Sequence, residues 1–195
     1  MPRKPRQASP SSVYHWITRG VNKKQLFHNL CDYRYYYQLL LECALEFDTH
    51  IHHYCLMPNH VHLLLRASEL NLLSKFSHCI ARRYAFYYSS RHNWEGQVFQ
   101  RSYKSLPVEN DSYLLECGRY IERNPVRAKI VEDPAEYAFS SYARYAFSKT
   151  DKLIITSPAY LDMAKTEASR NFHYRRYVTE TREYEKLIGK WMSKI

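Results

Sequence analysis

Four stretches of the chain alternate hydrophobic and polar side chains, or are rich in β-branched and aromatic residues, and these patterns predict β-strands. The second and third stretches meet at Pro58 and Asn59, a pair that is typical of a tight turn. They are therefore expected to form a hairpin. The predicted strands are 13–18, 49–57, 59–66 and 98–106.

Three other stretches place hydrophobic residues at helical spacing. Asp32 is the expected N-cap of the first helix, and residues 110–112 are expected to cap the third. The third helix should end at Asn124, because a residue that precedes a proline avoids the helical conformation. The predicted helices are 33–47, a second that begins at Asn71 or Ser74 and runs to residue 90, and 113–123.

The order of these elements is strand, helix, hairpin, helix, strand, helix. It predicts an α+β fold of the ferredoxin-like plan, an antiparallel sheet with helices on one face and the other face free for a substrate. Beyond this unit, residues 184–192 have an amphipathic helical pattern. We therefore expect a basic N-terminal tail at 1–12, a main domain at 13–148 and a helical C-terminal extension at 149–195.

The charge of the chain changes this picture of an ordinary small domain. Lysine and arginine number 29 against 19 acidic residues, which gives a net charge of +10 and an isoelectric point near 9.3. Such a balance favours a polyanionic partner, and nucleic acid is the most common one. The 19 tyrosines suit base stacking beside basic side chains, although many of their rings must belong to the core.

Other motifs are missing from the sequence. The five cysteines have no CxxC spacing, which argues against a zinc knuckle or a disulfide framework and favours reduced thiols in a cytoplasm. No signal-peptide pattern and no apolar run of about 20 residues is present. Neither a P-loop nor a GxGxxG pattern occurs, so nucleotide hydrolysis is not indicated.

The predicted hairpin carries a candidate metal site. His60 and His62 are two residues apart, so on a strand they point to the same face, and both imidazoles could reach one cation. A His-x-His pair alone is more often two ordinary, partly exposed histidines. His15, His52 and His53 are rival ligands, for which a place in the core or behind a ligand is the more common role.

The third predicted helix holds a second group of polar side chains. Tyr120 and Asn124 are one helical turn apart and share a face, while Arg119, Arg123 and Arg127 supply positive charge that a phosphodiester needs. Taken alone, Tyr120 could be a core ring and Asn124 a cap of the helix end.

Together, the segments Met57-Pro58-Asn59-His60-Val61-His62 and Tyr120-Ile121-Glu122-Arg123-Asn124-Pro125-Val126-Arg127-Ala128 resemble those of one family. This family is the His-hydrophobic-His, single-tyrosine transposases of the insertion-sequence type, and the nearest branch is the REP-associated tyrosine transposases of bacteria. The resemblance extends over residues 13–146 and more loosely into 160–177.

The resemblance implies a metal-dependent single-stranded DNA endonuclease and strand transferase that acts through a 5′-phosphotyrosine intermediate on hairpin-forming repeat DNA. Tyr120 would be the nucleophile, and His60, His62 and Asn124 would bind the divalent metal, Mg²⁺ or Mn²⁺. Other family members have glutamine at the position of Asn124. The resemblance also implies that the protein acts as a monomer or a homodimer.

Two other functions remain open at this stage. One is a non-catalytic protein that binds single-stranded nucleic acid, and the other is a metal phosphoesterase in which water attacks in place of Tyr120. In each case the basic side chains, together with the amide of Asn22, are candidate DNA contacts. These candidates are Arg19, Asn22, Lys23, Lys24, Arg82, Arg83, Arg101, Lys104, Arg119, Arg123 and Arg127.

Overall fold

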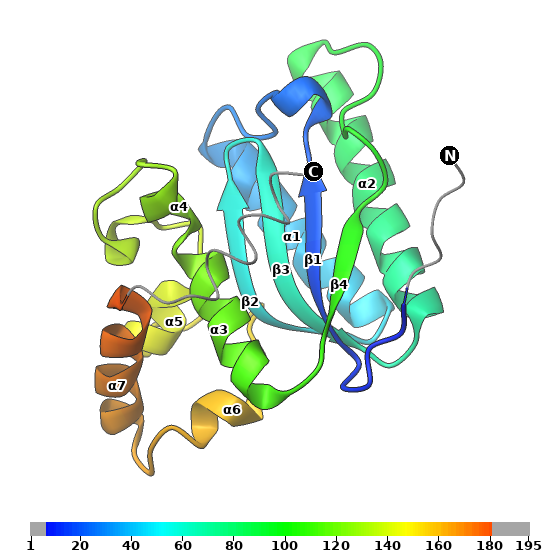
Figure 1. Ribbon diagram of the computed structural model, residues 1–195. Helices are drawn as coiled ribbons and strands as arrows, with labels where there is room; N and C mark the ends of the chain where they lie inside the picture. The colour runs from blue at the N-terminus through cyan, green and yellow to red at the C-terminus, as the bar shows by residue number, and fades with distance from the viewer. Residues whose placement is uncertain (1–6, 181–195) are drawn as a thin grey trace.

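A computed structural model of the protein describes residues 7–180 (Figure 1). Its centre is a four-stranded antiparallel sheet in the order β2-β3-β1-β4. With the connection β1-α1-β2-β3-α2-β4, this order is the predicted ferredoxin-like plan. The strands are β1 (Val13–Arg19), β2 (Thr49–Met57), β3 (His60–Ala67) and β4 (Lys104–Val108).

Helices cover both faces of this sheet (Figure 1). Helices α1 (Leu30–Glu46) and α2 (Leu70–His92) pack on one face, where Trp16 and Leu63 belong to the larger core. Helix α3 (Asp111–Glu122) lies across the other face and packs on Leu64. The fold class is as predicted, but the face expected to be free for a substrate is partly covered: α3 packs over β2 and β3, because its hydrophobic residues need an apolar surface to pack on.

The alternation of side chains along the strands decides what each face contains. On β3, Val61, Leu63 and Leu65 enter the core beneath α1 and α2. The intervening residues, His60 and His62 among them, point to the face that α3 covers. The strand therefore carries polar rings under a helix that contains Tyr120.

Most boundaries differ from the prediction by one or two residues, and the starts of α1 and β4 differ by more. Asp32 is not the N-cap of α1: Asn29 holds that position, and Asp32 is the third helical residue of a capping box that accepts the N–H of His28 and Asn29. The fourth strand begins only at Lys104. Segment 98–100 pairs separately with the end of β1, through the N–H of Gln100 and the carbonyl of Arg19. A bend between these two pairings interrupts the ladder.

The described part of the C-terminal region packs against α3 as a third core cluster, with Tyr145, Tyr160 and Tyr174 at its centre. The expected terminal helix at 184–192 lies outside the described residues. At the other end of the chain, Ser9 is buried, and its hydroxyl donates to the carbonyl of Val108 at 2.9 Å. The shorter elements are η1 (Val21–Lys23), α4 (Asn124–Arg127), η2 (Pro134–Glu136), α5 (Tyr142–Phe147), α6 (Pro158–Leu161) and α7 (Glu167–Thr179).

Candidate active site

His60 and His62 lie side by side under α3. Their ring centroids are 4.8 Å apart, His62 is buried and His60 is half-buried. Burial lowers the pKa of His60 to about 3, with Arg19 adding to the effect, and lowers the pKa of His62 well below its usual value. Both rings are therefore neutral at pH 7, which is the form of imidazole that binds a metal ion.

Tyr120 brings a phenol to the same place. Its side chain is only 2% exposed, and its ring centroid lies 6.1 Å from that of His62 and 5.9 Å from that of His15. The guanidinium carbon of Arg127 lies 4.4 Å from the centroid of the phenol ring, although the Arg127 side chain as a whole is exposed. The fold thus gathers a phenol, two neutral imidazoles and an arginine from β3, α3 and α4.

Asn124 follows Tyr120 by one turn and is almost buried. Its amide nitrogen donates to the backbone carbonyls of Tyr120 and Ile121 at 3.0 and 3.1 Å, so the side chain does bind the helix end. The amide oxygen of Asn124 can then accept a hydrogen bond or bind a cation.

The donor atoms around these rings fit a divalent cation. The Nε2 atom of His62 is buried and has no hydrogen-bond partner among the described residues. No three His, Cys, Asp or Glu side chains within residues 7–180 are arranged to hold a metal ion. The oxygen of Asn124 remains the candidate third ligand beside His60 and His62, and such a mixed nitrogen and oxygen set suits Mg²⁺ less well than Mn²⁺.

The three rival histidines lie in different surroundings. His15 is buried behind His62, and its Nε2 lies 2.9 Å from Nδ1 of His62. His52 donates from Nδ1 to the carbonyl of Ile155 at 2.7 Å. His53 donates from Nδ1 to Glu122 at 2.9 Å. Of the three, only His15 contacts the predicted ligands.

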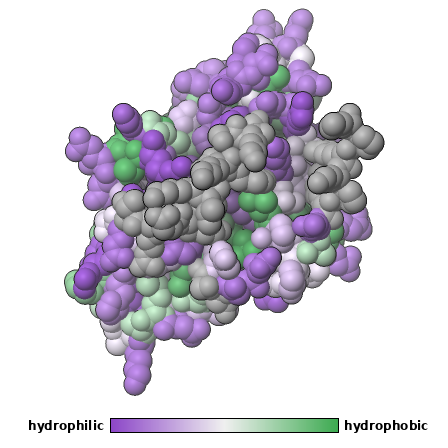
Figure 2. Space-filling view, in the orientation of Figure 1, coloured by the Kyte–Doolittle hydropathy of each residue, from purple (hydrophilic) through white to green (hydrophobic). Residues whose placement is uncertain are grey.

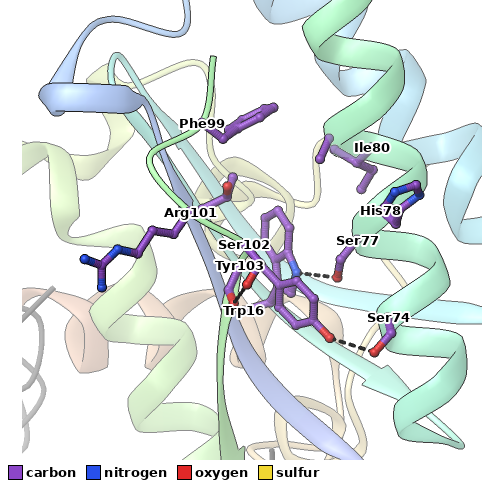
Figure 3. A pocket seen from close by; sticks show the side chains of 11 residues that line it. Trp16, Ser74, Ser77, His78, Ile80, Phe99, Arg101, Ser102 and Tyr103 are labelled. Atoms are coloured by element: carbon purple, nitrogen blue, oxygen red, sulfur yellow. Dashed lines mark hydrogen bonds between the residues drawn. The ribbon is translucent and has the colours of Figure 1, made fainter. Parts of the chain in front are cut away.

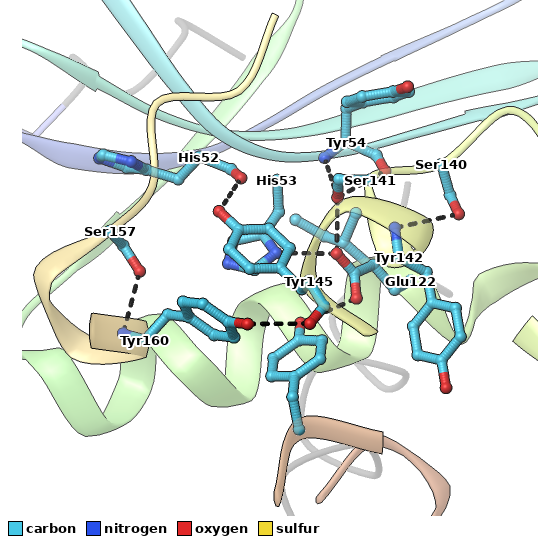
Figure 4. Close-up of polar contacts among 12 residues, drawn as sticks. His52, His53, Tyr54, Glu122, Ser140, Ser141, Tyr142, Tyr145, Ser157 and Tyr160 are labelled. Carbon is cyan, nitrogen blue, oxygen red and sulfur yellow. Dashed lines mark hydrogen bonds and ion pairs between the residues drawn. The ribbon is translucent and has the colours of Figure 1, made fainter. Parts of the chain in front are cut away.

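A buried network around Glu122 was not predicted (Figure 4). The Glu122 side chain is 0% exposed and accepts hydrogen bonds from His53, from Ser141 at 2.6 Å and from Tyr174 at 2.8 Å. It thereby joins α3 to β2, to the residue before α5 and to α7. We call His53, Glu122, Ser141 and Tyr174 the Glu122 network.

One signal for this network exists in the sequence. Gly118 precedes Glu122 by one helical turn, and a Cβ atom at Gly118 would lie 2.7 Å from the His53 ring. A glycine one turn before a carboxylate, on the hydrophobic side of a helix, indicates that another group approaches closely there. The partners in β2, α5 and α7 are distant in sequence, and no local pattern reveals them.

A loop with two lysines, residues 20–25, which we call the basic loop, follows β1 beside His60. The backbone N–H of Gly20 donates to Asn59, and those of Leu26 and Phe27 donate to Pro58, so the loop is held against the β2–β3 turn. Gly20 is required there, because a Cβ atom would lie 2.2 Å from the carbonyl oxygen of Lys24. Within this loop Asn22, Lys23 and Lys24 are exposed, whereas Arg19 before it is half-buried.

Four other predicted DNA contacts lie on α2, on β4 or in the segment before β4. Arg82 and Arg101 are exposed, Lys104 is half-buried, and Arg83 forms an ion pair with Glu42.

Arg119 and Arg123 are turned toward the end of α7. Arg119 is 0% exposed and donates to the carbonyl of Tyr177, and Arg123 donates to those of Val178 and Thr179. In this structure these two arginines fasten α7 to α3, and we do not include them in a DNA surface.

A cavity of about 340 Å³ lies on the opposite side of the sheet, between β1, α2 and segment 99–103 (Figure 3). Its wall is mostly aromatic and apolar. The indole N–H of Trp16 donates to Ser77 at 2.8 Å, and the hydroxyls of Ser74 and Tyr103 are 3.1 Å apart. Because Trp16 and His15 are neighbours on a strand, they point to opposite faces, and this cavity is separate from the site of Tyr120.

Comparisons with known proteins place the chain in a family. The family model described as "Transposase IS200 like" matches residues 8–124, which is more than half of the chain. No curated protein matches the chain. None of the described helices is long and apolar enough to cross a membrane.

Two solved structures are similar to this chain. A REP-associated tyrosine transposase bound to a REP hairpin is 15% identical, with a TM-score of 0.64 over 80% of this chain and 93% of that chain. A proposed transposase from Deinococcus radiodurans is 22% identical over 66% of this chain and 92% of that chain; its TM-score of 0.43 carries no argument. The first likeness supports the fold, and the family model supports the assignment: the chain belongs to the IS200-like transposase family and is a transposase enzyme.

Proposed function

We propose that this transposase is a metal-dependent endonuclease and strand transferase for single-stranded DNA, and that it acts through a 5′-phosphotyrosine formed by Tyr120. The observation that carries the proposal is the packing of the Tyr120 ring against His62, whose buried Nε2 has no partner among the described residues. A phenol beside neutral imidazoles with a free ring nitrogen is a nucleophile next to a candidate cation site.

The proposed substrate class is hairpin-forming repeat DNA. The REP-associated transposase that shares this fold is bound to a REP hairpin, and we transfer that substrate class, not its sequence. The net charge of +10 is consistent with a polyanion, and hydrophilic side chains dominate the face seen in Figure 2. The proposed contacts are the exposed side chains of the basic loop, together with Arg82, Arg101 and Arg127.

In the proposed reaction, the Tyr120 oxygen attacks a phosphodiester phosphorus. The bond from phosphorus to the 3′ oxygen breaks, the phenol loses its proton, and the departing 3′ oxygen gains one. The products are a 5′-phosphate ester of Tyr120 and a free 3′-OH. Attack by another 3′-OH on this ester reverses the step and joins strands without ATP, because a phenolate is a moderately good leaving group.

His60, His62 and Asn124 would hold the divalent ion, which supplies charge stabilisation at the non-bridging phosphate oxygens when bound. The protein's own residues have separate tasks. Arg127 lies over the Tyr120 ring, where its positive charge is available to the phosphate that Tyr120 attacks. Helix α3 fixes Tyr120 relative to the two imidazoles, so the reacting groups need little reorganisation.

The test uses a labelled single-stranded DNA hairpin with a flanking single strand, incubated with the protein and Mn²⁺. The wild-type protein should form a covalent adduct that survives denaturing electrophoresis, and Tyr120→Phe should form none. Tyr113→Phe is the matched control, since Tyr113 is an exposed tyrosine of the same helix, and it should behave as wild type.

Each alternative gives a different result. An adduct in Tyr120→Phe would contradict the nucleophile assignment. Cleaved DNA without attached protein, persisting in Tyr120→Phe, would instead indicate attack by water. DNA binding that survives EDTA, with no cleavage under any condition, would favour a non-catalytic binding protein.

A further inference from the structure

We propose that Asn59 and His15 are positioning residues for His60 and His62: Asn59 sets the ring tautomer of His60, and His15 accepts the Nδ1–H of His62 when a cation binds, so that both rings present an unprotonated Nε2 to the same cation. The inference rests on the proposed function, because it concerns the ring atoms that would meet the metal. Neither residue would touch the cation. A neutral imidazole carries one N–H and one bare nitrogen, and only the bare nitrogen can be a ligand.

The hydrogen bonds around Asn59 determine the tautomer of His60. The Asn59 amide nitrogen donates to the backbone carbonyl of Lys23 at 3.2 Å, and a carbonyl can only accept. The amide oxygen must then be the atom that faces Nδ1 of His60, at 2.6 Å. Because this oxygen also can only accept, His60 has its proton on Nδ1, and its Nε2 is bare.

The His15–His62 pair has two possible arrangements, because either ring can donate across the 2.9 Å contact between Nε2 of His15 and Nδ1 of His62. If His15 donates, the proton of His62 is on Nε2, and that atom cannot bind a cation. If His62 donates, its Nε2 is bare, and the proton of His15 is on Nδ1.

Both outer nitrogens of this pair, Nδ1 of His15 and Nε2 of His62, are buried without a hydrogen-bond partner among the described residues. The protein alone therefore gives neither arrangement a hydrogen bond that the other lacks. A cation at Nε2 of His62 selects the arrangement in which His62 donates. In that arrangement His15 carries the second proton of the pair, on Nδ1, so both arrangements hold the same number of protons.

The same contacts link the site to the basic loop. Lys23 is exposed, and its backbone carbonyl accepts from Asn59, which in turn accepts from His60. A phosphate contact made by this loop would therefore be connected to a metal ligand through a single side chain. Partners of this kind, bound to the far nitrogen of a ligand histidine, commonly change metal affinity by about 10–100-fold when they are removed.

The experiment combines ring ¹⁵N NMR of histidine-labelled protein with Mn²⁺ affinity measured by EPR. In the free wild-type protein, His60 should be protonated at Nδ1 and bare at Nε2. With Zn²⁺ added as a diamagnetic probe, His62 should be protonated at Nδ1, with its Nε2 bound to the metal. Asn59→Ala and His15→Phe should each weaken Mn²⁺ binding by about 10-fold or more.

Conservative variants and a matched control separate positioning from folding. Asn59→Asp keeps an acceptor for His60 but cannot donate to Lys23, so His60 should stay protonated at Nδ1. His15→Gln offers an amide oxygen to His62 and should recover most of the affinity that His15→Phe loses. His52→Phe removes another buried histidine, one that contacts Ile155, and should bind Mn²⁺ as wild type does.

A His60 ring protonated at Nε2, or unchanged Mn²⁺ affinity in folded Asn59→Ala and His15→Phe, would overturn the inference while leaving the proposed function intact. A wild-type protein that binds neither ion would contradict the metal in the proposed function. In that case the spectrum of His60 in the metal-free protein still tests this inference: protonation at Nδ1 would support it, and protonation at Nε2 would contradict it.

Discussion

Helix α3 covers two groups of buried histidines on one face of the sheet, one over β2 and the other over β3 and β1. Over β2, His53 belongs to the Glu122 network, in which the carboxylate accepts from three side chains. Over β3 and β1 lie the rings of His15, His60 and His62, which we call the site histidines. His62 contacts both His15 and His60, and His60 contacts Asn59. The two outer nitrogens of the His15–His62 pair lack partners among the described residues.

Each group holds a buried ring nitrogen without a partner among the described residues, but the surroundings differ: Nε2 of His53 belongs to a cluster tied together by a buried carboxylate, whereas Nε2 of His62 lies in a ring packed against His60 and Tyr120. Glu122 is fully buried with its oxygens occupied, and it ties distant segments of the chain together. Two nitrogens of the site histidines are buried without a hydrogen-bond partner among the described residues, and such an atom costs about 1–3 kcal/mol of folding free energy. An unpaired nitrogen beside a second neutral imidazole and a phenol is a candidate for function, because a cation can supply the missing partner.

The largest expected effect comes from replacing one histidine in each group by leucine and measuring DNA cleavage per folded molecule. His62→Leu should reduce cleavage by about 10³-fold, since several kcal/mol of charge stabilisation would be lost with the cation. His53→Leu should cleave within a few-fold of wild type. Equal losses in the two variants would mean that the distinction between the groups is wrong.

When stability is measured by chemical unfolding, His53→Leu should have the larger effect of the two variants. His53→Leu removes a donor from the buried Glu122 carboxylate and should lower the free energy of unfolding by about 3–5 kcal/mol. His62→Leu removes a ring that already has an unpaired nitrogen but leaves Nε2 of His15 without its partner, so it should lower the free energy of unfolding by about 1–3 kcal/mol, less than His53→Leu does. A larger loss in His62→Leu would show that the site histidines are structural.

The free energy of unfolding should fall on acidification, because the site histidines have depressed pKa values in the folded protein. Burial lowers the pKa of His15 to about 3 and that of His62 well below its usual value, whereas an unfolded histidine titrates near about 6.5. As the pH falls below this value, the unfolded chain gains protons that the folded chain does not, so stability is lost. Each ring adds a slope of up to about 1.4 kcal/mol per pH unit.

This slope can be measured as the free energy of unfolding between pH 7 and pH 4 in EDTA. His62→Leu should flatten the curve, because one of these rings is gone. A His62→Leu curve parallel to that of wild type throughout this range would contradict the assignment of neutral, buried rings.

The smallest expected effect concerns the basic residues on the two sides of α3. Lys23→Ala should weaken binding of single-stranded DNA a few-fold and reduce the magnitude of the salt slope by about 1, as for one lost phosphate contact. Arg119→Ala should leave the salt slope unchanged and lower stability instead, because Arg119 is buried against α7. Fluorescence anisotropy at several salt concentrations measures both variants, and a reversed pattern would place the DNA on the α7 side.

Much of this fold follows from local patterns. Alternation predicted β2 with its observed bounds, and helical spacing predicted α1, α2 and α3. One error is local and one is tertiary. Asn29 caps α1 in place of Asp32, because the two residues form a capping box, and β4 starts late because segment 98–100 pairs with the other end of β1.

The candidate site was partly predictable for the same reason. His60 and His62 share a strand face, and Tyr120 and Asn124 share a helix turn, so each pair follows from spacing. The packing of Tyr120 against His62 joins residues that are far apart in sequence, and the family resemblance, rather than any spacing, led us to expect it. Nothing local indicated that His15 would lie behind His62, or that Glu122 would collect three donors from separate segments.

The central claim is that Tyr120 becomes covalently attached to DNA beside the site histidines. The most direct measurement is mass spectrometry of the trapped protein–DNA adduct after nuclease and trypsin digestion. Cleavage after Arg119 and Arg123 releases the peptide 120–123, which contains a single tyrosine. We predict that this peptide carries the phosphate-linked nucleotide. A nucleotide on any other tyrosine, or cleaved DNA with no modified peptide, would contradict the account.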